Sequence, residues 1–168
     1  MNIVGIDPSL TATGIVHANG TTMMTVSGGV GDLRLVLLWK AVQLAADVAD
    51  LAVIEDLPVH GMGAGKTGMA QGVVRLSLMV LPVPYVTVTP ATLKKFATGR
   101  GNATKADMRM ELWKRAEIDI RDDNQVDAWW LRQLGLAHYG MTEVVLPKTH
   151  LDALAKVEWA PAPAAVAA

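Results

Sequence analysis

Four acidic residues stand where carboxylates could converge on one point of a fold. Asp7 and Glu55 each close a short apolar run. Asp123 and Asp127 lie one helical turn apart, so they share nearly the same helix face. Hard cations such as Mg²⁺ prefer oxygen ligands, and a two-metal hydrolytic site needs several carboxylates around ions about 3.5–4 Å apart. The four acids are therefore candidate ligands of a divalent-metal nuclease site.

The elements that must position these acids follow a mixed α/β order. Apolar, β-branched runs predict three antiparallel strands, with Asn19-Gly20 as a two-residue hairpin turn between the second and third. The run 51–55 is typical of a buried parallel strand. If it lies beside the first strand, Asp7 and Glu55 meet at one sheet edge, and the last helix brings Asp127 to them. The predicted segments are strands 2–7, 13–18 and 21–27, helix 32–50, strand 51–55, a flexible stretch 58–68, helix 69–81, strand 84–88, and helices 90–96, 104–116 and 123–139.

Capping residues mark several of the predicted helix starts. Asp32 is a candidate cap for helix 32–50, and Thr89 precedes a proline at a first helical position. Thr104 and Asp107 have the spacing of a capping box. In helix 32–50 the residues near helical spacing are Leu33, Val36, Leu37, Lys40, Leu44 and Val48.

Composition indicates a folded domain with ordinary net charge. The chain has 168 residues, of which 51% are hydrophobic and 18% charged, which suits one domain with a real core. It has no cysteine, which excludes disulfides, thiolate zinc sites and cysteine nucleophiles. We find no signal peptide and no apolar run of membrane-spanning length, so a cytoplasmic location is expected. The predicted domain spans 1–140, and 141–168 is an extension with an Ala/Pro-rich mobile tail.

Basic charge is concentrated in one segment of a chain whose formal net charge is −1. A local positive face can bind phosphates through counterion release even when the whole protein is nearly neutral. A solvated helix face explains the same charges equally well. Seven basic residues stand against two acids between 94 and 115, namely Lys94, Lys95, Arg100, Lys105, Arg109, Lys114 and Arg115.

Five segments in order resemble the RuvC family of Holliday-junction resolvases, within the RNase H-like superfamily. The resemblance covers about residues 2–140, and the polar run 123–127 is closer in style to bacteriophage-encoded members. The similar segments are Gly5-Ile6-Asp7-Pro8-Ser9-Leu10-Thr11-Ala12-Thr13-Gly14, Ile54-Glu55, Gln71-Gly72-Val73-Val74, the basic run from Lys94 to Lys105, and Asp127-Ala128.

The resemblance implies an RNase H-like mixed sheet and metal-dependent cutting of four-way DNA junctions by paired symmetric nicks. Asp7, Glu55, Asp123 and Asp127 would hold two Mg²⁺ ions, for which Mn²⁺ can substitute. Lys105 would assist catalysis. It also implies a homodimer packed through helix 69–81, whose apolar face holds Met69, Leu76, Met79 and Val80. The sequence itself does not imply a branch-migration motor as a partner. The predicted DNA-binding residues are Lys94, Lys95, Arg100, Lys105, Arg109, His60 and Lys66.

Two departures from the family pattern leave alternatives open. Asn124 stands where relatives carry an acid or histidine, so Asp123, Asp122 or Asn124 is the fourth site residue. Pro58 stands where relatives place an aromatic wedge. The alternatives are a broader nuclease on forks, flaps or R-loops, a junction-binding protein with weakened catalysis, and a nucleotide hydrolase built on 63–67, a near miss of a phosphate loop. The five tryptophans are predicted to pack in the core or in a dimer interface rather than to stack on bases.

Overall fold

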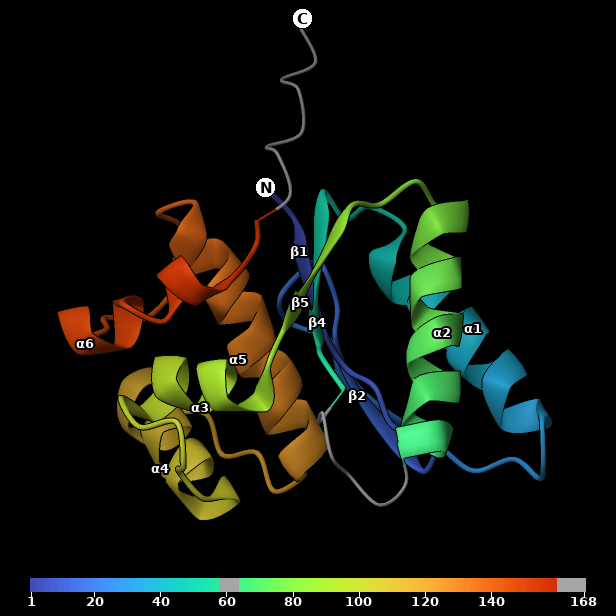
Figure 1. Ribbon diagram of the computed structural model, residues 1–168, viewed down its shortest axis with the longest axis horizontal. Coiled ribbons are helices and arrows are strands. Elements are labelled where there is room, and N and C mark those ends of the chain that lie inside the picture. The colour runs from blue at the N-terminus through green and yellow to red at the C-terminus, as the bar shows by residue number, and fades with distance from the viewer. Residues whose placement is uncertain (58–63, 160–168) are drawn as a thin grey trace, which may run out of the picture.

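A five-stranded mixed sheet forms the centre of the computed structural model, which describes residues 1–57 and 64–159 (Figure 1). The strand order is β3-β2-β1-β4-β5. β1 pairs antiparallel with β2 and β2 with β3, whereas β1–β4 and β4–β5 are parallel. The predicted mixed sheet and the neighbouring placement of the first and fourth strands are thus confirmed. The strands are β1 (Ile3–Asp7), β2 (Ala12–Val16), β3 (Met23–Ser27), β4 (Leu51–Glu55) and β5 (Tyr85–Val88).

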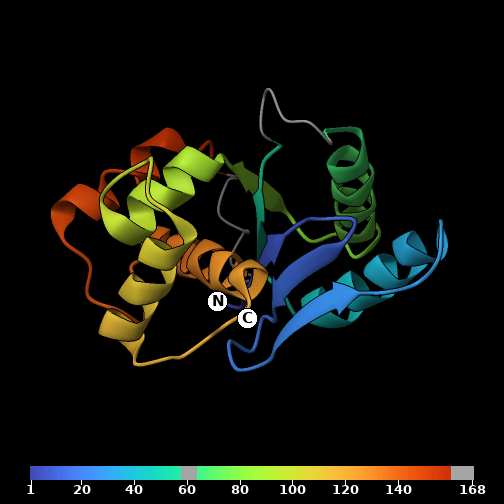
Figure 2. The same ribbon diagram turned by 90° about the horizontal axis from the view of Figure 1, so that it is seen from below.

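Helices cover both faces of this sheet, as the view from below shows most clearly (Figure 2). α1 (Leu33–Ala46) and α2 (Ala64–Val80) pack on one face over a core that includes Ile6, Leu38 and Val74. The second core lies on the opposite face and includes Trp129 and Trp130. The helices on that face are α3 (Pro90–Thr98), α4 (Lys105–Ala116), α5 (Asp123–His138), α6 (Lys148–Leu151) and the short 3₁₀ helix η1 (Leu154–Lys156).

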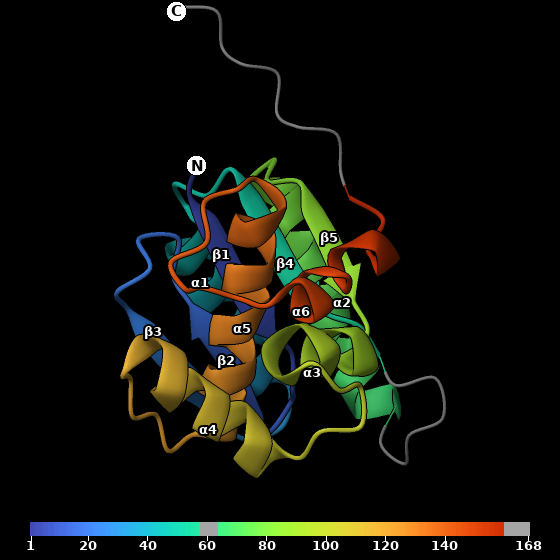
Figure 3. The ribbon, with the colours of Figure 1, turned by 90° about the vertical axis from the view of Figure 1, so that its left-hand side faces the viewer.

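Glycines allow α5 to lie directly on the sheet (Figure 3). A Cβ on Gly5 of β1 would overlap the carbonyl oxygen of Ala128, and a Cβ on Gly14 of β2 would overlap that of Asn124. A Cβ on Gly135 of the helix would come within 2.8 Å of a Val53 methyl group. Backbone thus packs against backbone, a separation that larger residues would prevent. The acid-bearing first turns of α5 are consequently held next to the ends of β1 and β2.

Local signals predicted some helix starts correctly. The Thr89 hydroxyl accepts a hydrogen bond from the backbone N–H of Thr92 at 3.3 Å, as an N-cap does. Thr104 and Asp107 form the predicted capping box, with bonds of 2.8 and 3.2 Å between each backbone N–H and the other side chain. Asp32 precedes α1 but makes no side-chain cap bond.

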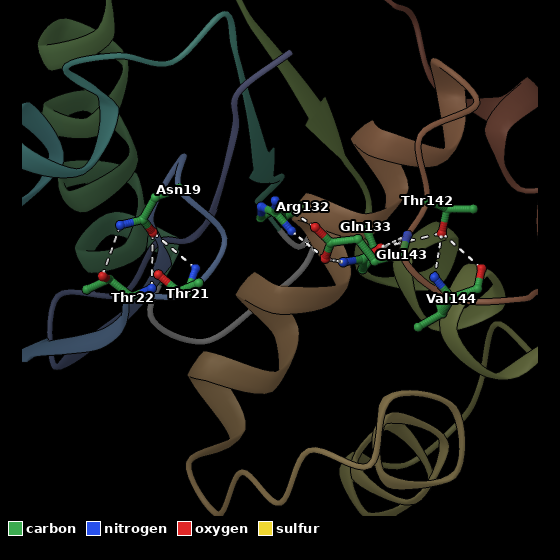
Figure 4. A network of polar contacts seen from close by, with 8 residues as sticks. All are labelled: Asn19, Thr21, Thr22, Arg132, Gln133, Thr142, Glu143 and Val144. Carbon is green, nitrogen blue, oxygen red and sulfur yellow. Dashed lines mark hydrogen bonds and ion pairs between the residues drawn. The ribbon is translucent and has the colours of Figure 1, made fainter.

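Three segment predictions were wrong. The β2–β3 connection is longer than two residues, because Asn19 accepts bonds from the backbone N–H groups of Thr21 and Thr22 and organises a wider loop (Figure 4). α2 begins at Ala64, so residues 64–68 are helical rather than part of a flexible stretch. α1 ends at Ala46, before the predicted end.

The apolar stripe predicted on α1 faces outward. The helix instead buries Leu38, Val42, Ala45 and Ala46 against the sheet and α2. Periodicity identified an apolar face but not its direction, because small alanines also pack well against a sheet. The exposed members of the stripe are Leu33, Val36, Leu37, Leu44 and Val48.

Residues 141–159 fold back onto the helices of the second core. Arg132 donates two bonds, of 2.8 and 3.0 Å, to the carboxylate of Glu143, and Gln133 contacts the same group (Figure 4). His150 is buried and its Nδ1 lies 2.8 Å from the carbonyl oxygen of Phe96. These contacts fasten the segment to α5 and α3. The predicted mobile tail from 161 lies outside the described residues, within which no helix is long and apolar enough to cross a bilayer.

Candidate active site

Asp7 and Glu55 meet at the carboxyl ends of two neighbouring parallel strands. Ile6 of β1 is in register with Ile54 of β4, so the next residue of each strand is an acid. Asp7 is only 7% exposed. Burial raises the pKa of both carboxyl groups, which lie close enough together to share a proton. This is the juxtaposition that the sequence predicted.

Asp127 brings a third carboxyl group to this pair from α5. Burial, followed by the charge of Asp7, raises its pKa from 3.8 to about 7. The charge of Asp127 in turn raises the pKa of Glu55. Three acids in one partly buried place cannot all ionise cheaply without a compensating positive charge. The arrangement is therefore suited to binding a cation.

Two lysines supply positive charge beside the acids. The charge of Lys105 opposes the effect of burial on the pKa of Asp7, Glu55 and Asp127, and that of Lys94 does so at Asp127. Lys94 lies on α3, and Lys105 is the first residue of α4, where free backbone N–H groups also favour anions. A phosphate that approached the three acids would thus meet cations from two helices.

The acids before Asp127 have distinct surroundings. Asp122, rather than Asp123, is the N-cap of α5: its carboxylate accepts from the backbone N–H of Asn124 at 2.9 Å and from the hydroxyl of Thr25. Asp123 is ion-paired with Arg109 and with Lys105, whose Nζ lies 3.8 Å away. The contact from β3 thus accompanies the N-cap role of Asp122, whereas Asp123 is paired with two cations of α4.

Sequence reasoning did not identify Thr25 or the two glycines that seat α5. No local motif marks Thr25, since its contact with Asp122 joins residues 97 positions apart. Gly14 was noted only within a family motif, although a side chain there would displace Asn124. These residues act by positioning α5.

The other predicted DNA-binding residues are spread around the site. Lys95 lies on α3, and Arg100 follows that helix, with a guanidinium nitrogen 3.6 Å from Asp107. Lys66 is exposed in the first turn of α2. His60 lies outside the described residues, as does most of the glycine-rich run that resembles a phosphate loop.

The donor chemistry of the three convergent acids fits a hard divalent cation. Carboxylate oxygens are the ligands that Mg²⁺ prefers, and a bound cation would offset the burial and mutual repulsion that raise their pKa values. Within residues 1–57 and 64–159, no three His, Cys, Asp or Glu side chains are grouped tightly enough to form a finished ligand shell.

Comparison with known proteins finds relatives that are named RuvC. No family model matches the chain. It is 33% identical over 122 residues to the crossover junction endodeoxyribonuclease RuvC of Sorangium cellulosum, covering 64% of this chain and 68% of that protein. It is 32% identical over 118 residues to the RuvC of Ruegeria pomeroyi, covering 62% and 72%.

Solved structures share the fold at lower identity. The Thermus thermophilus RuvC structure matches with a TM-score of 0.68 and 20% identity, covering 86% of this chain and 100% of that one. The same RuvC in complex with a Holliday junction substrate matches with a TM-score of 0.68 and 20% identity, covering 86% and 99%.

Proposed function

The chain belongs to the RuvC family of crossover junction endodeoxyribonucleases, and we propose that it resolves four-way DNA junctions by metal-dependent phosphodiester hydrolysis. The observation that carries this proposal is the convergence of Asp7, Glu55 and Asp127 beside Lys105. Paired nicks of matched polarity would leave two linear duplexes. A cytoplasmic location and a bacteriophage origin stay predictions.

Asp7, Glu55 and Asp127 would hold the divalent cations. Mg²⁺, for which Mn²⁺ substitutes, would supply charge stabilisation at the phosphate and a more acidic attacking water; two ions per site are proposed. The charge of Asp7 raises the pKa of both other acids, after burial, so Asp7 is the candidate shared ligand. Lys105 and Lys94 would hold the phosphate against this group and offset its negative charge as the reaction proceeds.

Asp123 is the proposed fourth acidic residue, and its ion pairs suggest two roles that can be separated. As a ligand it would tighten metal binding. As a partner of Lys105 and Arg109 it would hold these cations ready for phosphate. Asp123→Asn would raise the Mg²⁺ concentration needed for half-maximal cutting in the first case, and would weaken only DNA binding in the second. Asn124 donates to Asp122 and serves the helix cap.

A homodimer is proposed through the outward apolar faces of α1 and α2. Val36, Trp39 and Leu76 line a groove of about 230 Å³ between these helices. Met69, Met79 and Val80 extend the exposed apolar surface along α2. Contiguous apolar surface of this kind commonly marks an interface between chains. Two-fold symmetry would present two active sites to the two strands that must be cut.

The decisive experiment compares wild type with Asp7→Asn on a labelled immobile four-way junction, a fork and a linear duplex, in Mg²⁺ or EDTA. We expect paired symmetric nicks on the junction that require both metal and Asp7, with junction binding retained in the variant. Asp152→Asn, at an exposed position, is the control. Equal cutting of forks would indicate the broader branch nuclease. If the wild-type protein bound the junction tightly but did not cut it in Mg²⁺ or Mn²⁺, the protein would be a junction-binding protein. That outcome would fit Asn124, which stands where relatives carry an acid or histidine.

A further inference from the structure

Trp113 does not pack in the core of this chain, the first of the two packing roles predicted for the tryptophans. It is 53% exposed on α4, whereas Trp129 and Trp130 are buried. Its indole N–H donates to no group among the described residues, while those of Trp130 and Trp159 donate to backbone carbonyl oxygens. A half-exposed indole offers an apolar face and a polar N–H group, which suits contact with a binding partner.

Trp113 lines a shallow groove of about 330 Å³ together with Ala106, Arg109, Met110 and Asp119. Met110 is likewise about half exposed, and with Ala106 and Trp113 it makes the lining mainly apolar. Arg109 and Asp119 provide one cation and one anion at its borders. We call these five residues the Trp113 groove.

The groove lies on the same side of α4 as the basic residues that start next to the acids at the beginning of the helix. Lys105, Arg109 and Trp113 follow one another at intervals of four residues, which places them along one side of the helix. Eight residues at about 1.5 Å each separate Lys105 from Trp113 by about 12 Å along the axis. Successive nucleotides of one strand of B-form DNA are about 3.4 Å apart along the helix axis. A distance of about 12 Å therefore places the groove two to four nucleotides from a phosphate bound at Lys105.

We propose that the Trp113 groove stacks one unpaired nucleobase of the branched DNA, an inference that rests on the proposed function. The indole face offers a stacking surface that any base can use. The Asp119 carboxylate disfavours a phosphate at this place and can accept a hydrogen bond from a base N–H group. Arg109 lines the groove and pairs with Asp123, so it links the groove to the acids and can contact the intervening phosphate. Branch points supply bases with free faces, whereas an intact duplex does not.

The test uses four-way junctions that carry a single unpaired 2-aminopurine at successive positions, one to six nucleotides from the cleavage point. Binding is measured in EDTA with Asp7→Asn protein, alone and combined with Trp113→Ala, Trp113→Phe or Val145→Ala. Val145 is 90% exposed, does not line the groove and is the control. Circular dichroism and thermal melting establish that each variant is folded.

We expect 2-aminopurine fluorescence to be quenched only at positions two to four nucleotides from the cleavage point. Trp113→Ala should abolish this quenching and weaken binding of those junctions about 5- to 100-fold, as loss of a stacking residue does. Trp113→Phe should retain most of both effects, and Val145→Ala all of them.

Unchanged quenching and affinity in folded Trp113→Ala would overturn the inference while leaving the proposed function intact. If Trp113→Ala instead altered only self-association, measured by sedimentation, the groove would be a protein contact and the inference would again be wrong. If the parent protein failed to bind any junction, and wild type failed to cut one, the proposed function would fail first and this inference with it.

Discussion

Replacing Asp127 with asparagine should make the metal-free protein more stable while abolishing cutting. The folded state holds this carboxyl group in a buried place beside Asp7, which raises its pKa from 3.8 to about 7. The folded protein therefore binds this proton more tightly than the unfolded chain does. The stabilisation from that proton is complete below about pH 4 and is lost as the pH rises through about 7.

The size of the gain in stability follows from the raised pKa of Asp127. One pKa unit corresponds to about 1.4 kcal/mol, so a pKa moved from 3.8 to about 7 costs the folded state about 4 kcal/mol at pH 8. The side chain is partly exposed and asparagine leaves a polar amide in its place, so we expect about half of this as a gain for Asp127→Asn. About 2 kcal/mol corresponds to a rise in Tm of roughly 4–8 °C for a chain of this size.

The assay is thermal unfolding from pH 4 to 8 in EDTA, with Asp152→Asn as the exposed control. The gain should be largest at pH 8 and should close near pH 4. Adding Mg²⁺ should raise the Tm of wild type more than that of Asp127→Asn, because a cation bound only by the folded state stabilises it. Equal Tm values at pH 8 in EDTA, or a gain that grows toward pH 4, would refute the reasoning that buried mutual repulsion sets this pKa.

Three further predictions concern the supports of the site. Gly14→Ala should push α5 away at Asn124 and lower the unfolding free energy, measured by urea titration, by about 3 kcal/mol. At temperatures below the unfolding midpoint of the variant, cleavage should fall more than 10-fold. A fully active variant would contradict the close packing. Glu143→Gln should cost about 1–2 kcal/mol at pH 7, because Arg132 is 7% exposed and loses its carboxylate while Glu143 itself is 52% exposed. Burial alone would raise the pKa of Glu143, but hydrogen bonds from Arg132 and Gln133 lower it. The loss of unfolding free energy in Glu143→Gln should therefore be present at neutral pH and vanish in thermal melts well below pH 4. A loss that is the same at every pH would contradict this prediction. Thr104→Ala removes the N-cap of α4 and should lower the Tm by roughly 2–5 °C without changing the metal requirement, as calorimetry and cleavage assays can establish.

Local and pairwise signals in the sequence predicted much of the framework. A continuous apolar strand ending in Glu55 predicted its parallel pairing, because strands buried on both faces have this pattern. The Thr104–Asp107 spacing predicted a capping box because both partners lie within one turn. Asp122 and Asp123 could not be told apart in this way, since a hydroxyl from β3 and two cations from α4 decide their roles.

The wrong predictions for surface residues have the same cause, since contacts between distant segments are not visible in local sequence patterns. Helical periodicity indicates that a face is apolar but not whether the chain itself covers it, and the stripe on α1 with Leu44 is exposed. Trp113 is similar, since its residue type favours burial and only the arrangement of neighbouring elements leaves it in solvent. That Asp7, Glu55, Asp123 and Asp127 act as a ligand set stays a prediction.

The backbone contact between α5 and the sheet has a consequence for how substrates are chosen. With Gly5 and Gly14 against carbonyl oxygens of the helix, the acids are anchored to a close-packed interior that resists deformation. The DNA must then supply whatever bending brings its phosphate to them. An intact duplex is stiff over about 150 base pairs and bends at considerable cost, whereas a branch point bends with little resistance. Selectivity for branched DNA can thus arise from the compliance of the substrate, without any contact that reads its sequence.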